Sequence, residues 1–128
     1  MRSIRIALTL VALIPSLSAA QQVVGRDGRV FTRNETVARG EWFRLHIRQG
    51  DITVTEGTGA QVELRAEKIL RQGSVTDIAF VVRRVGSGVV ICAVYEDSDD
   101  CNEDGFRPEW RRWPRNFRPP TLSVTLKV

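Results

Sequence analysis

The chain has 128 residues, 42% of them hydrophobic and 27% charged, and its formal net charge is +4. This length fits one domain of ordinary size. The net charge is too small to predict a nucleic-acid partner.

Residues 1–20 have the pattern of a secretory signal peptide. Arg2 and Arg5 supply a positive start, residues 6–14 are apolar but too short to span a bilayer, and small residues at 18–20 suit cleavage before Gln21. The alternative is a helix that stays as an anchor or packs in the core. We expect export to the periplasm or the exterior, with no transmembrane segment after processing. The mature chain is then residues 21–128, a single all-β domain whose charge is about +2, because two arginines are removed from +4.

Residues 41–70 predict three short strands. Apolar and polar side chains alternate in each run, which is the period of a half-buried strand. Glycine turns at 49–51 and 56–59 separate the runs, and Gly50 suits the positive φ of a tight turn. The apolar members of the three runs are Phe43, Leu45, Ile47, Ile52, Val54, Val62, Leu64 and Ala66.

Further strands are expected on both sides of this stretch. Val30 and Phe31 start a short one, and residues 75–84 alternate before a two-glycine turn at 85–88. Residues 89–95 are apolar at every position, which indicates a strand covered on both faces. Residues 121–128 alternate again and predict a final strand, whose exposed edge could pair with a protein partner. The fold class is therefore all-β, either solenoid-like or a two-layer stack of short antiparallel strands.

The order of these segments resembles a known family. A hydrophobic strand, a glycine turn, the stretch DITVTEGTGAQVELRAEK and the later GVVICAVY are similar to the N-terminal part of the bacterial DUF4097 family of exported, adhesin-like proteins. The resemblance covers residues 31–128 and rests on turn glycines and apolar alternation. It implies a β-solenoid-like fold in the bacterial envelope, with no catalytic residues to carry over.

The two cysteines, Cys92 and Cys101, predict a structural disulfide. A small exported domain has a limited core, and disulfides form in the compartments that it reaches. A metal site or a redox pair is the alternative, but further ligands and the CxxC spacing are missing from the sequence.

An acidic loop at residues 96–105 is a candidate Ca²⁺ site, because Ca²⁺ prefers clustered oxygen ligands. Its spacing does not match an EF-hand, since Asn102 stands where the loop needs glycine. A solvated acidic loop is the favoured interpretation. The candidate ligands are Asp97, Asp99, Asp100, Glu103 and Asp104.

Residues 106–120 interleave arginine with aromatic side chains and proline. Such a loop can bind an anionic polymer, because aromatic faces stack on ligands and guanidinium groups bind anions. The alternative is that the tryptophans cover the sheet and the arginines pair with the preceding acids. The candidate binding residues are Trp110, Arg111, Arg112, Trp113 and Arg115.

No catalytic constellation is recognisable in the sequence. His46 is the single histidine, and no marked serine or acid accompanies it. We therefore expect a non-catalytic structural or adhesin-like module without a cofactor. The alternative is a module that binds an envelope polymer through loop 106–120 or Ca²⁺ through loop 96–105.

Overall fold

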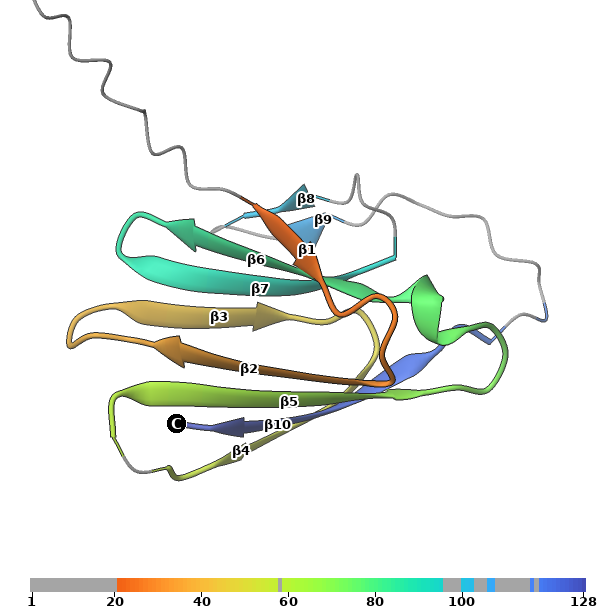
Figure 1. Cartoon of the computed structure of the whole chain (residues 1–128), viewed down its shortest axis with the longest axis horizontal. Coiled ribbons are helices and arrows are strands. Elements are labelled where there is room, and N and C mark those ends of the chain that lie inside the picture. The colour runs from red at the N-terminus through yellow and green to blue at the C-terminus, as the bar shows by residue number, and fades with distance from the viewer. Residues whose placement is uncertain (1–20, 58, 96–99, 103–105, 108–115, 117) are drawn as a thin grey trace, which may run out of the picture.

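The computed structural model describes residues 21–57, 59–95, 100–102, 106–107, 116 and 118–128 (Figure 1). Two four-stranded sheets form two layers, and a short two-stranded ribbon lies outside the first of them. Sheet A has the strand order β1 (Gln22–Val24), β6 (Ala79–Val85), β7 (Gly88–Val94), β3 (Trp42–His46). Sheet B has the order β2 (Val30–Thr36), β5 (Gln61–Ile69), β10 (Thr121–Lys127), β4 (Gly50–Thr55). The ribbon pairs β8 (Asp100–Cys101) with β9 (Phe106–Arg107).

The all-β prediction is confirmed, and of the two arrangements left open the chain has the two-layer stack. The expectation of antiparallel pairing is incomplete, because β3 pairs with β7 and β4 pairs with β10 in parallel. The reason is that short connections join edge strands of different sheets, β1 to β2 and β3 to β4. A strand that crosses between layers in this way need not form a hairpin with the next strand.

The last strand is not at an edge, so the predicted partner edge on residues 121–128 is wrong. β10 lies between β5 and β4 and pairs with both (Figure 1). It separates β4 from β5, so these two strands, which follow each other in the chain, do not form a hairpin. Gly57 N donates to Val128 O at 2.6 Å at the end of this inserted strand.

The strand predicted at residues 75–84 begins late. Residues 75–77 form a 3-10 turn, η1 (Val75–Asp77), because Ser74 caps it. The Asp77 carboxylate accepts from Ser74 N at 2.8 Å, which completes a capping box.

The part of the chain that the structure describes contains no helix with the length and apolar character of a membrane span.

The main core lies between the sheets, and every residue of β7 is buried, as its uniform apolar sequence predicts. Alternate β7 residues face the main core and a second, outer cluster that includes Cys101. Both faces of β7 are therefore covered. The main core consists of Phe31, Val62, Leu64, Ala66, Ile78, Phe80, Val82, Val89, Ile91, Ala93, Tyr95, Leu122, Val124 and Leu126.

A lysine occupies an inward position of the sandwich. Lys68 continues the buried alternation of β5 and is 1% exposed. Its ammonium donates to three carbonyl oxygens: Gly25 O at 2.7 Å, Arg26 O at 3.0 Å and Val75 O at 2.6 Å. Three carbonyls match the three protons of an ammonium group, so the buried charge is fully hydrogen-bonded. One side chain thus connects the β1–β2 loop, η1 and β5.

The three hydrogen bonds of the Lys68 ammonium form a lysine clamp. Glycine is needed at position 25, where this clamp lies next to the aromatic rings of the core. Its φ is +72°, and a Cβ there would lie 2.8 Å from the Phe31 ring and 3.0 Å from the Phe80 ring. Those two rings stack with centroids 4.3 Å apart. A side chain at this position would therefore displace the stack as well as strain the backbone.

Replacing Lys68 with methionine is expected to lower the free energy of unfolding by about 1–3 kcal/mol, since the buried carbonyls lose their donor. Chemical denaturation monitored by circular dichroism measures the change. The control is Lys127→Met, which alters an exposed lysine and should change stability by no more than about 0.5 kcal/mol. Equal stability of the Lys68→Met variant and the parent chain would contradict a stabilising clamp.

The same lysine predicts a pH dependence. Burial lowers the pKa of Lys68 below its ordinary value of 10.5, positive Arg26 lowers it further, and Asp27 and Asp77 partly oppose them. Between this lowered pKa and 10.5 the unfolded chain binds more protons than the folded chain, so stability rises with pH. The unfolding free energy of the parent chain, relative to Lys68→Met, should increase as pH approaches 10.5. A difference that decreases over this window would contradict the lowered pKa.

Candidate binding surface

The outer face of sheet B is a continuous polar surface, built by strand register. Strands β2, β5, β10 and β4 align their outward side chains in rows across the sheet. The central row is Thr32, Arg65, Thr125, Thr53, and the next is Asn34, Glu63, Lys127, Thr55. Opposite side chains on neighbouring strands are close enough to contact one ligand together.

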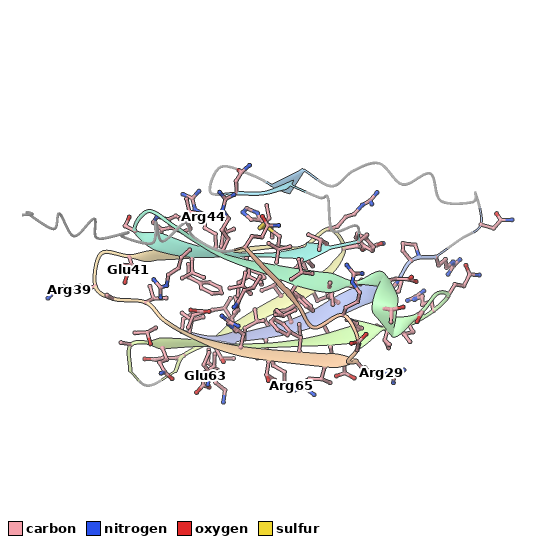
Figure 2. The ribbon with its side chains drawn as sticks, turned by 45° about the horizontal axis from the view of Figure 1, so that its top comes forward. Arg29, Arg39, Glu41, Arg44, Glu63 and Arg65 are labelled. Atoms are coloured by element: carbon pink, nitrogen blue, oxygen red, sulfur yellow. A yellow bond between two sulfur atoms is a disulfide. The ribbon has the colours of Figure 1, made fainter. Side chains whose placement is uncertain are left out.

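These rows are open to solvent. Seven of the eight side chains in them are exposed and Thr125 is half-buried. Figure 2 shows Glu63 and Arg65 directed away from the sandwich, on the side opposite Arg44. The surface is slightly hollowed, with a depression of about 270 Å³ over its centre. The depression is lined by Thr32, Asn34, Glu63, Leu64, Arg65, Thr125 and Lys127.

The charges on this face are locally balanced. Glu63 lies beside Lys127 in the register, and Arg65 Nη1 lies 3.4 Å from Glu67 Oε2. The hydroxyl and amide groups between them both donate and accept hydrogen bonds. Such a surface suits a neutral, hydroxyl-rich ligand better than a strongly anionic one, because balanced charges create no net attraction for anions.

The outer face of sheet A has a different construction. Cys92 and Cys101 form the predicted disulfide, with Cα atoms 5.9 Å apart, and it fixes the β8–β9 ribbon to β7. Arg83 Nη1 donates to Cys101 O at 3.3 Å. Both cysteines are buried, so this face is covered where the ribbon lies on it.

His46 lies beside this disulfide, opposite Cys92 in the β3–β7 register. Its Nε2 atom is buried and has no hydrogen-bond partner among the described residues. Farther along β3, the Arg44 guanidinium lies over the Trp42 ring, 4.8 Å from its centroid. A cation in this position is attracted by the aromatic face, so β3 presents a mixed polar and aromatic edge to the outside.

The two loops predicted as binding sites lie mostly outside the described residues. Trp110, Arg111, Arg112, Trp113 and Arg115 of the arginine–tryptophan loop are outside them, as are Asp97, Asp99, Glu103 and Asp104 of the acidic loop. Asp100 is described as part of β8. Among the described residues there is no group of three or more His, Cys, Asp or Glu side chains that could hold a metal ion.

The polar face of sheet B was not predicted from the sequence. Threonines at 53 and 55 and at 121 and 125 are visible as the outward partners of two alternating runs. Nothing local shows that these two runs are neighbours. The signal that could have found the face is threonine recurrence at outward positions of several strands, combined with a correct strand order.

Comparison of the chain with protein-family models, curated proteins and solved structures finds no match. The resemblance to the DUF4097 family therefore remains a prediction.

Reduction of the Cys92–Cys101 disulfide is expected to lower the free energy of unfolding by about 3 kcal/mol, because the open chain gains conformational entropy when it unfolds. Denaturation with and without a thiol reductant measures the difference. The control is a chain with both cysteines replaced by alanine, whose stability should not respond to the reductant. An equal response of both chains would show that the reductant acts elsewhere.

Proposed function

We propose that the chain is an exported, non-catalytic, adhesin-like binding module whose contact surface is the outer face of sheet B. The observation that carries the proposal is the register of that sheet, which places Thr32, Arg65, Thr125 and Thr53 in one exposed row. The disulfide supports an oxidising, exported compartment. The N-terminal pattern of residues 1–20 agrees with that location.

The class of ligand follows from the chemistry of the face. Hydroxyls, an amide and paired charges can exchange hydrogen bonds with the hydroxyl groups of a polysaccharide. Each such bond contributes only about 0.5–1.5 kcal/mol net, because both groups leave water. Neither of the two rows contains an aromatic residue on which a sugar could stack. We therefore expect each copy of the face to bind weakly, and expect several copies to bind a repetitive polymer more tightly together.

The anionic-polymer alternative involves residues of loop 106–120 and predicts a different preference. Arginine-rich loops favour negatively charged polymers through bidentate contacts. The balanced face of sheet B favours neutral ones. A comparison of the two polymer classes therefore separates the two surfaces.

Affinity electrophoresis in gels that contain dextran or polygalacturonate tests the proposal. The chain should be retarded by the neutral dextran, and Asn34→Ala combined with Thr125→Ala should reduce the retardation several-fold, because both substitutions remove polar groups from the depression. The matched control is Ser87→Ala, an exposed hydroxyl in the β6–β7 turn. Retardation by polygalacturonate alone, lost on Trp110→Ala with Trp113→Ala, would favour loop 106–120 instead.

A further inference from the structure

The four edge strands of the two sheets differ in how they are protected against pairing with another chain. β1 has only three residues. β2 turns the charged pair Arg33 and Glu35 toward the interior, where Nε and Oε1 lie 2.7 Å apart. β3 carries the exposed charge of Arg44 and is half-buried at its other positions. Short length and inward or exposed charges are the usual protections of sheet edges.

The fourth edge strand, β4, is less protected than the others. It is six residues long, its inward residues carry no charge, and its one charged residue is Asp51 near its start. All six of its residues are exposed, and none is lysine, arginine or proline. Ile52 and Val54 are 43% and 59% exposed, although they align with the buried Val124 and Leu126 of β10 on the inner face. An exposed edge strand with apolar side chains and without Lys or Pro is a template for another strand.

Among the described residues, β10 is the one strand that pairs with β4, so the other edge of the β4 backbone has no strand partner there. Gln49 O accepts from Leu122 N at 3.2 Å, and Thr55 O accepts from Val128 N at 3.0 Å. The backbone groups of odd-numbered residues in this segment therefore point toward β10. In a parallel ladder alternate residues direct both backbone groups to the same neighbour. Ile52 and Val54 therefore direct their N–H and C=O groups to the open edge.

We propose that β4 pairs antiparallel with β4 of a second copy of this chain, with a two-fold axis at Thr53. In this register Ile52 lies opposite the partner's Val54, so apolar side chains meet on the inner face. Asp51 lies opposite the partner's Thr55, and the two like charges of Asp51 stay apart. The strand is thus complementary to itself, which an isologous two-fold interface requires.

Pairing through β4 would also bury apolar side chains on the inner side of this edge. Phe43, Leu45 and Ile47 are only partly buried and pack at the margin of the main core. A second copy that pairs through β4 places its own Ile52 and Val54 on this inner side and removes apolar surface from water. Association then continues the core from one copy to the next.

The pairing does not depend on the proposed ligand, but it would arrange two ligand surfaces together. A two-fold axis perpendicular to the joined sheet leaves both outer faces of sheet B on the same side. Two weak sites on one surface gain affinity for a polymer because the second contact becomes intramolecular.

Sedimentation of the full purified chain over a range of concentrations tests the interface. The parent chain should form a dimer, and Val54→Lys should raise its dissociation constant about tenfold or more, because a charge enters the apolar seam. Val30→Lys is the matched control: it makes the same change at a 43% exposed valine on edge strand β2 and should dimerise as the parent does. A monomeric parent chain, or equal dimerisation of both variants, would overturn the proposal.

Single cysteine substitutions test the register. Thr53→Cys should form a disulfide-linked dimer under mild oxidation, because facing residues in a non-hydrogen-bonded pair have Cα atoms about 4.5 Å apart. Thr55→Cys should cross-link only when mixed with Asp51→Cys. Equal cross-linking of Thr53→Cys and Thr55→Cys alone would overturn the two-fold axis at Thr53. Dextran retardation of monomeric Val54→Lys separates failure of this interface from failure of the polar face, since Val54 points to the inner side.

Discussion

The buried ammonium of Lys68 is the constraint on which one end of the sandwich depends. A charge in an apolar interior is costly, so it is tolerated only where every proton has an acceptor. Three carbonyls from two separate connections meet this requirement. The β1–β2 loop and η1 must therefore keep their backbone conformations. The need for glycine at position 25 and the stacked Phe31 and Phe80 rings belong to the same arrangement.

The two sheets share a core but have different outer faces. Sheet A is covered by the β8–β9 ribbon, which the disulfide holds against β7, and its outer side chains form a second apolar cluster. Sheet B leaves rows of threonine and balanced charges in solvent. This asymmetry gives sheet A a structural role. Sheet B offers the broader exposed polar face of the two, which is why the proposed function is placed there.

The two sides of the sandwich are also unequal. The side of β1 and β2 is held by the lysine clamp and guarded by inward charges. The side of β3 and β4 has an apolar, exposed edge strand. The first side therefore carries the usual protections of sheet edges, and the second side carries fewer of them. The proposed pairing through β4 follows from this difference and would link the polar faces of two copies.

The sequence by itself determined the features that depend on local chemistry. Period-two alternation identified β3, β4, β5, β6 and β10, two glycines identified the β6–β7 turn, and the uniform apolar run identified β7 as the most buried strand. Strand β1 was not predicted, and β8 and β9 lie in segments that were predicted to be loops. The cysteine pair predicted the disulfide because the chain has only two cysteines and a small exported domain favours disulfides. These predictions succeeded because each depends on residues close together in the chain.

The tertiary structure alone decided the strand order and everything that follows from it. Period-two alternation indicates which side chains share a face of a strand, but it does not indicate which strands are neighbours in the sheet. The insertion of β10 between β4 and β5, the parallel pairs and the inward lysine at position 68 are outcomes of long-range packing. The polar rows of sheet B and the open edge of β4 exist only in that order. Their residues are separated in sequence and become one surface only when hydrogen bonding between distant strands sets the register.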